Sequence, residues 1–180
     1  LGADLSNVKV HSDPSAQQST AAMGARAFAY GADVFLGPGE SPTDFPLMAH
    51  ELTHVVQQRG APPLPQRNVA VGAQDSPAER EADAVADAVR DHYKPVGQGD
   101  DVPTAPVTVA VSLADKLDTL AQFFAAGMPP TGSKDPFALR RAAIGFLSLL
   151  LQNDLRCSLK DMLLATGAAT SFDSLEEFLV

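Results

Sequence analysis

The feature that most constrains this chain is the pentapeptide His-Glu-Leu-Thr-His at residues 50–54. In an α-helix, side chains four positions apart lie on the same face. A helix over residues 46–58 therefore directs the imidazoles of His50 and His54 toward one ion. Glu51 occupies the next position, where a carboxylate reaches a water on that ion without binding the metal itself. The pattern predicts a helix with two metal ligands and a general base.

A further ligand has to come from another element, because a catalytic zinc ion binds more than two protein groups and keeps one position open. The best candidate is the acidic stretch Glu-Arg-Glu-Ala-Asp at residues 79–83. Glu79 stands at the start of a predicted helix and is preferred, because Glu81 points to a different face of it. Asp83 lies one turn later, where it accepts a hydrogen bond from a ligand histidine. The predicted Zn²⁺ ligands and catalytic base are His50, His54, Glu79 and Glu51.

Other interpretations of these residues stay open. One is a helix with surface histidines followed by an acidic helix, and another is a zinc ion bound without catalysis. Peptide hydrolysis also needs a group that stabilises the oxyanion in addition to the metal. Tyr30, His11 and His92 are the polar candidates, and spacing selects none of them. His11 lies at the end of a predicted strand, where a histidine is more often structural.

Four segments of the first half carry a more specific resemblance. They are Val-Lys-Val-His-Ser-Asp (8–13), Gly-Ala-Arg-Ala-Phe-Ala-Tyr-Gly-Ala-Asp-Val-Phe-Leu-Gly-Pro-Gly (24–39), Leu-Met-Ala-His-Glu-Leu-Thr-His-Val-Val-Gln-Gln (47–58) and Ser-Pro-Ala-Glu-Arg-Glu-Ala-Asp (76–83). With them, residues 1–86 resemble a bacterial zincin-like metallopeptidase domain that is often attached to cargo of extracellular contractile injection systems. The resemblance implies a minimal αββ zincin with zinc on His50, His54 and Glu79 and with Glu51 as base. It also implies a targeting or docking role as an alternative.

Composition narrows the classes of partner. The chain has a formal net charge of −9, and each half contains more acidic than basic side chains. This balance argues against non-specific binding of nucleic acid. The metallopeptidase interpretation makes a peptide or protein substrate the expected partner. Cys157 is the single cysteine, which excludes an intrachain disulfide and a cysteine-rich metal site. Apolar runs are too short for a membrane span, so no membrane partner is expected.

Periodicity and capping residues predict a mainly helical chain with a small sheet. In the first half we expect a strand at 9–11, a helix over 15–27, a hairpin over 28–35 around Gly31, a loop over 61–74, and a helix that Ser76-Pro77-Ala78-Glu79 opens and that ends near Tyr93. In the second half we expect a loop over 94–106 and helices over 107–126, 136–151, 159–166 and 174–179. Asp115 and Asp118, which flank Lys116, are interpreted as a solvated helix face.

The second half resembles a different family, in the segments Val-Ala-Asp-Ala-Val-Arg-Asp-His-Tyr-Lys-Pro (85–95), Val-Pro-Thr-Ala-Pro-Val (102–107), Leu-Ala-Asp-Lys-Leu-Asp-Thr-Leu (113–120) and Pro-Thr-Gly-Ser-Lys-Asp-Pro-Phe-Ala-Leu-Arg-Arg-Ala-Ala (130–143). Residues 84–165 are similar to the helical HD-like region, and the part after it, of the bacterial glycyl-tRNA synthetase beta subunit. The resemblance implies no aminoacylation here, because that site belongs to a separate alpha subunit. Asp115 matches the last aspartate of an HD-type metal site whose other elements are missing, so no HD hydrolase activity is expected.

Together these features predict an α+β, mainly α chain: a zincin-like metallopeptidase domain over residues 1–86 and a helical segment, resembling part of the glycyl-tRNA synthetase beta subunit, over residues 87–180. The leading hypothesis is a zinc-dependent metallopeptidase fused to this synthetase-derived segment. The alternatives are a non-catalytic zinc-binding docking or targeting module, and a synthetase fragment with a tRNA-associated role through Lys134, Arg140 and Arg141.

The two resemblances overlap at residues 80–88, as expected for a gene fusion or a chimera. The chain begins with Leu1 rather than methionine and shows no signal peptide, which favours a piece of a longer protein. The helical half would lack its native neighbours, so association between copies through this half is an expectation. The synthetase half indicates the cytoplasm, whereas the zincin half is compatible with export as an effector.

Overall fold

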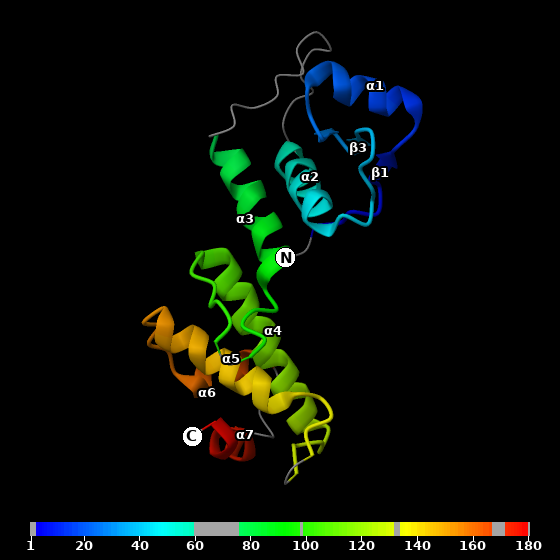
Figure 1. Cartoon of the computed structure of the whole chain (residues 1–180). Coiled ribbons are helices and arrows are strands. Elements are labelled where there is room, and N and C mark those ends of the chain that lie inside the picture. Colours follow the sequence, from blue (N-terminus) through cyan, green and yellow to red (C-terminus); the bar gives the residue numbers. More distant parts are fainter. Residues whose placement is uncertain (1–2, 60–75, 98, 132–133, 167–171, 180) are drawn as a thin grey trace. The chain divides into compact units, whose positions relative to one another are not determined.

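The structure, a computed structural model, describes residues 3–59, 76–97, 99–131, 134–166 and 172–179. The chain divides into two compact units, Leu1–Arg90 and Asp91–Val180 (Figure 1). The described residues form one three-stranded sheet and are otherwise mainly helical, which confirms the predicted α+β, mainly α class. None of the helices in these ranges is long and apolar enough to cross a bilayer. The predicted loop over 61–74 lies outside the described residues.

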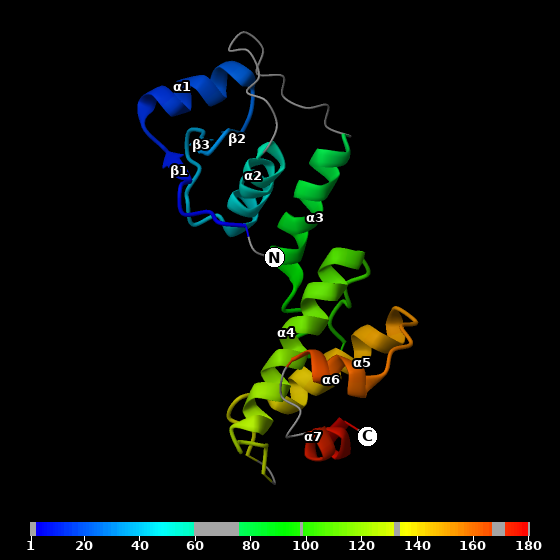
Figure 2. The ribbon, with the colours of Figure 1, turned by 180° about the vertical axis from the view of Figure 1, so that it is seen from behind.

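The sheet of the first unit has the strand order β1-β3-β2. Strand β1 (Lys9–His11) runs parallel to β3 (Asp33–Leu36), and β2 (Ala27–Tyr30) runs antiparallel to it. The β2–β3 hairpin turns at Gly31, whose φ of 62° suits a residue without a side chain, and this confirms the predicted hairpin. In both views the strands lie between helices α1 and α2 (Figures 1 and 2). The buried cluster of this unit consists of Ala27, Val34, Leu36, Met48 and Val55.

Helix α1 (Pro14–Met23) is shorter than predicted. It begins as expected, because the Asp13 carboxylate accepts hydrogen bonds from the backbone N–H groups of Ser15 and Ala16. It ends at Gly24, which has a φ of 65° and closes the helix with a left-handed residue. The predicted end at Ala27 is wrong, because Ala27 already belongs to β2.

Helix α2 (Phe45–Gln58) contains the pentapeptide at 50–54 and begins at a well-fixed N-terminus. The Asp44 carboxylate accepts a hydrogen bond from the backbone N–H of Leu47 at 3.2 Å. Arg26, which precedes β2, pairs with Glu40 at 2.7 Å and with Asp44 at 3.2 Å. The Arg26 guanidinium holds the pKa of the Glu40 carboxyl below its ordinary value. These contacts tie the start of α2 to the sheet.

Helix α3 (Pro77–Asp91) completes the first unit and runs beside α2 in both views (Figures 1 and 2). The Ser76 hydroxyl accepts a hydrogen bond from the Glu79 backbone N–H at 3.1 Å. This contact confirms the predicted cap and helix-starting proline. Glu79 therefore lies in the first turn of α3, at the end of the helix that is fixed by the cap.

The second unit is built from α4 (Pro106–Ala125), α5 (Leu139–Gln152), α6 (Leu159–Ala165) and α7 (Phe172–Leu179). Their apolar faces pack on one another, with the fully buried side chains Phe146, Leu120, Leu139, Leu149, Leu163 and Leu175. Helix α5 begins three residues later than the predicted Pro136. The reason is that the Asp135 carboxylate accepts hydrogen bonds from the N–H groups of Leu139 and Arg140, at 2.7 and 3.0 Å.

Lys116 on α4 is buried, with 5% of its surface exposed, although the sequence places it between two acidic residues. Its ammonium donates to the carbonyl oxygens of Tyr93 at 2.9 Å and Lys94 at 3.1 Å and to the Ser112 hydroxyl at 3.1 Å. Burial lowers the pKa of Lys116 below its ordinary value. A Cβ at Gly145 of α5 would lie 2.8 Å from the Lys116 Cε and 3.0 Å from the Pro95 carbonyl oxygen, so a larger residue there would make one of these groups shift. Asp115 and Asp118 are exposed, as the solvated-face interpretation of these two residues predicts, whereas Lys116 between them is buried.

Candidate metal centre

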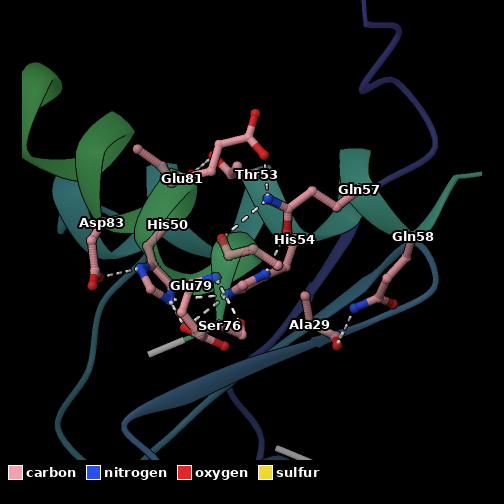
Figure 3. Close-up of polar contacts among 12 residues, drawn as sticks. Ala29, His50, Thr53, His54, Gln57, Gln58, Ser76, Glu79, Glu81 and Asp83 are labelled. Atoms are coloured by element: carbon pink, nitrogen blue, oxygen red, sulfur yellow. Dashed lines mark hydrogen bonds and ion pairs between the residues drawn. The ribbon is translucent and has the colours of Figure 1, made fainter. Parts of the chain in front are cut away.

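The three predicted ligands converge at one point between α2 and α3 (Figure 3). The spacing of four residues brings His50 and His54 together, with their Nε2 atoms 3.1 Å apart. Glu79 approaches from α3, with its Oε2 atom 3.3 Å from His50 Nε2 and 3.4 Å from His54 Nε2. The side chains are partly buried, with 21%, 16% and 20% of their surface exposed for His50, His54 and Glu79. They form a compact triangle of two ring nitrogens and one carboxylate oxygen.

The dimensions of this triangle fit a metal ion. Zinc binds histidine nitrogen and carboxylate oxygen at about 2.0–2.2 Å in a tetrahedral arrangement, which places neighbouring ligand atoms about 3.4 Å apart. The observed separations between the three ligand atoms are 3.1, 3.3 and 3.4 Å. The donor types and their spacing thus suit zinc, and the group could hold a metal ion through His50, His54 and Glu79.

Each histidine also has a partner at its other ring nitrogen. Asp83 lies one turn after Glu79 on α3, and its Oδ1 atom is 3.1 Å from His50 Nδ1. The sequence placed Asp83 beside a ligand histidine, and the structure places it at His50. His54 Nδ1 instead lies 2.9 Å from Oε1 of Gln57, three residues later on the same helix. Sequence reasoning missed Gln57, although the i, i+3 spacing from His54 was the available signal.

Glu51 is the most buried polar residue of this region, with 4% of its surface exposed. Among the residues that the structure describes, its Oε2 atom is the buried side-chain oxygen without a hydrogen-bond partner. Burial raises the pKa of Glu51 to about 7, while nearby His54 opposes the rise and Glu79 adds to it. A buried carboxylate with an unpartnered oxygen is costly, and this one is next to His50 in the chain.

The remaining candidates lie in other surroundings. Glu81 accepts a hydrogen bond from the Gln57 amide nitrogen at 2.8 Å. His11 pairs with Asp33 at 2.7 Å and stacks on Phe35, which is a structural setting within the sheet. Tyr30 lies at the end of β2 and is 36% exposed. These surroundings do not assign an oxyanion-stabilising role to His11 or to Tyr30. His92 belongs to the second unit.

The cationic residues considered for RNA contact lie on the second unit. Arg141 borders a cavity of about 260 Å³ that Asp115 and Lys116 also line. Lys134 borders a different cavity of about 180 Å³. The structure therefore places Lys134 and Arg141 at separate cavities, each of which also has an acidic residue in its lining, Asp135 beside Lys134 and Asp115 beside Arg141.

Comparison with known families assigns the two parts of the chain differently. A family model described as the eCIS core domain matches residues 1–62, which contain His50, Glu51 and His54. A model of the glycyl-tRNA synthetase beta subunit matches residues 69–180, more than half of the chain. The chain belongs to the glycyl-tRNA synthetase beta subunit family. Both resemblances found in the sequence are thus confirmed.

Curated glycine–tRNA ligase beta subunits are similar to this chain over a little under half of its length. The glycine–tRNA ligase beta subunit of Rhodospirillum centenum is 60% identical over 87 residues, which are 48% of this chain and 12% of that protein. That of Paracoccus denitrificans is 67% identical over 75 residues, which are 42% of this chain and 11% of that protein. The chain therefore spans about an eighth of the length of these relatives.

The candidate metal ligands are divided between the two matched ranges. His50 and His54 lie in the range that matches the eCIS core domain, and Glu79 and Asp83 lie in the range that matches the synthetase beta subunit. All four residues belong to the first compact unit, which extends to Arg90. The structural unit thus includes a helix from the synthetase-matching range.

Proposed function

We propose that the first unit is a zinc-dependent peptide hydrolase with His50, His54 and Glu79 as ligands and Glu51 as general base. The supporting observation is the convergence of the three ligand atoms at separations of 3.1 to 3.4 Å. Two unprotonated ring nitrogens and a carboxylate oxygen that turn their lone pairs to one point repel one another, and a metal ion or a proton between them relieves this repulsion. Their partial burial strengthens both this repulsion and the binding of a metal.

Each residue of the candidate centre has a separate role in the proposed reaction. A bound zinc ion polarises a peptide carbonyl and lowers the pKa of a water that it holds. His50 and His54 hold the ion from one face of α2, and Glu79 holds it from α3. Glu51, adjacent to His50 and with an unpartnered Oε2 atom, accepts the proton of the attacking water and passes it to the leaving amine. This assignment makes the first half a hydrolase of peptide bonds.

Metal content is the first test. The parent chain, His50→Ala and the control His92→Ala are purified without chelator, supplied with zinc, freed of excess and measured by mass spectrometry. We expect about one zinc per chain in the parent and in His92→Ala and none in His50→Ala, because loss of one ligand leaves the site with only two. An equal zinc content in all three proteins would contradict the assignment of ligands.

Turnover is the second test. Glu51→Gln retains the shape of the side chain and removes its ability to accept a proton. We expect this variant to bind zinc like the parent and to cleave a peptide library about 10²- to 10⁴-fold more slowly, the usual contribution of a general base. Mass spectrometry of the library detects both the cleaved bond and its rate. Equal rates for parent and Glu51→Gln would remove Glu51 from the reaction.

The low exposure of Glu51 favours a second candidate, a zinc-stabilised docking or targeting module. With 4% of its surface exposed, the carboxylate offers little area to a substrate. The match to the eCIS core domain is compatible with such a role. In that case the parent binds zinc and no member of the peptide library is cleaved by it. The zinc and turnover measurements together therefore separate the two candidates.

A tRNA-associated role of the second unit would follow from its family, but the surface chemistry does not favour it. The chain has a net charge of −9, and Lys134 and Arg141 border separate cavities. Phosphate binding needs clustered cations and weakens steeply with salt. Binding of tRNA that falls with ionic strength, and that Arg141→Ala weakens, would reverse this preference.

A further inference from the structure

The side-chain amide of Gln57 joins α2 to α3 beside the metal centre. Its Oε1 atom lies 2.9 Å from His54 Nδ1. Its Nε2 atom donates to the backbone carbonyl of Ala78 at 3.1 Å and to the Glu81 carboxylate at 2.8 Å. Figure 3 shows His54, Gln57 and Glu81 around the start of α3. One neutral side chain thus contacts a candidate ligand and two fixed acceptors.

These partners determine which way the amide points. A carbonyl and a carboxylate can only accept hydrogen bonds, so the NH₂ group of Gln57 must face Ala78 and Glu81. The amide oxygen then faces His54 and can only accept, so His54 Nδ1 carries the proton. A neutral imidazole has one protonated and one unprotonated nitrogen, so the lone pair of His54 lies on Nε2. This atom is the one that faces His50 and Glu79.

We propose that Gln57, itself held by Glu81 and Ala78, is a positioning residue that fixes the tautomer of His54 so that Nε2 is presented to the metal. The proposal rests on the zinc site of the proposed function and is independent of peptide hydrolysis. Asp83 does the corresponding work for His50 with a carboxylate. Two histidines of one helix are therefore oriented by different groups, a side-chain amide for His54 and a carboxylate for His50.

The neighbouring glutamine supplies a matched control. Gln58 donates from Nε2 to the carbonyl of Ala29 at 3.1 Å, and its Oε1 accepts from the N–H of Gly31 at 2.8 Å. It therefore holds the β2–β3 hairpin rather than a ligand. Gln57→Met and Gln58→Met make the same change at adjacent positions of α2 and keep an unbranched side chain that favours helix. A difference between them reports on the contacts of Gln57.

The tautomer of His54 is the deciding readout. The full chain is labelled with ¹⁵N-histidine, kept free of zinc, and its ring nitrogens are observed by NMR, with His54→Gln to assign the signals. We expect His54 to carry its proton on Nδ1 in the parent and in Gln58→Met, and to populate the Nε2–H form in Gln57→Met. An unchanged tautomer in a folded Gln57→Met would overturn the proposal. If that variant does not fold, Gln57→Asn, whose amide is one methylene shorter, is measured in the same way.

Zinc affinity is the second readout, measured by competition with a coloured chelator. We expect Gln57→Met to bind zinc about 10- to 100-fold more weakly than the parent, as for other partners of ligand histidines, and Gln58→Met to match the parent. Equal affinities for the two variants would overturn the proposal. If the parent binds no zinc, the proposed function fails, and the tautomer in the zinc-free chain still decides the role of Gln57. Zinc binding without peptide cleavage removes the hydrolase and leaves this inference standing.

Discussion

The two units of the chain are held together in different ways. The first has a small buried cluster, Ala27, Val34, Leu36, Met48 and Val55, and places two histidines and two carboxylates in contact beside it. The second has a much larger cluster in which Phe146, Leu120 and Leu149 are fully buried. Apolar packing therefore accounts for the second unit, whereas the first unit places ionisable side chains together beside a small core. From the proposed zinc site we expect the stability of the first unit, and not that of the second, to depend on metal.

The strongest way to break this comparison is to damage the larger core. Phe146→Ala removes a fully buried ring from α5 and leaves a cavity. We expect the free energy of unfolding of the second unit to fall by about 3–5 kcal/mol. Hydrogen exchange followed by mass spectrometry should show faster exchange in peptides from α4 and α5, while peptides from α2 and the affinity for zinc stay as in the parent.

Leu36→Ala is the matched control for that experiment. Leu36 is fully buried in β3 of the first unit, so its truncation should cost about 2–5 kcal/mol there and weaken zinc binding. Faster exchange in α2 after Phe146→Ala, or in α5 after Leu36→Ala, would show that the two units unfold together and would contradict the comparison.

Withdrawal of zinc sharpens the same comparison from the other side. A ligand that binds only the folded state at about 100 times its Kd stabilises that state by about 2.7 kcal/mol. We expect this gain in the first unit alone, seen as slower exchange in α2 and α3 when zinc is added to chelator-treated protein. His50→Ala should abolish the response. Equal slowing in α5 would instead mean that zinc acts outside the centre formed by His50, His54 and Glu79.

Much of the metal centre could be predicted because its logic is local. The i, i+4 spacing of His50 and His54 defines one face of a helix, and the Ser76 cap fixes where α3 begins and hence where Glu79 lies. The relay from His54 through Gln57 to Glu81 could not be predicted in full. Its first contact has an i, i+3 spacing, but the second depends on how α3 is rotated against α2, which no local pattern specifies.

The helix ends and one buried charge show the limits of periodicity. Helix α1 ends at Gly24 because a glycine adopts a left-handed backbone there, and α5 starts late because Asp135 caps it from four residues away. Lys116 lies between the exposed Asp115 and Asp118, yet its spacing from Leu113 and Leu120 places it on the apolar face of α4. The carbonyl groups that receive its ammonium come from residues 92–94, which a pattern within α4 cannot reveal.

The smallest expected effect concerns Lys116 and tests whether burial or its hydrogen-bond acceptors determine the direction in which its pKa shifts. Burial lowers the pKa of Lys116 from its ordinary value of 10.5, so in the window below that value the unfolded chain binds more protons than the folded one. Stability of the second unit should then rise with pH through that window, by less than about 1.4 kcal/mol per pH unit because one proton is involved. Lys116→Met isolates the effect, because methionine does not titrate.

The measurement is urea unfolding of the parent and of Lys116→Met at several pH values from about 7 to about 10, and the quantity of interest is the difference between them. If the free energy of unfolding of the parent, relative to that of Lys116→Met, increases as pH rises, desolvation of the Lys116 ammonium outweighs its hydrogen bonds to the surrounding acceptors. A shift in the opposite direction would mean that the carbonyl oxygens of His92, Tyr93 and Lys94 hold the ammonium more strongly than water does. In that case the second unit would also depend on a cation held by fixed acceptors, as we propose for the first. The contrast between apolar and polar stabilisation would then lie within α4 rather than between the units.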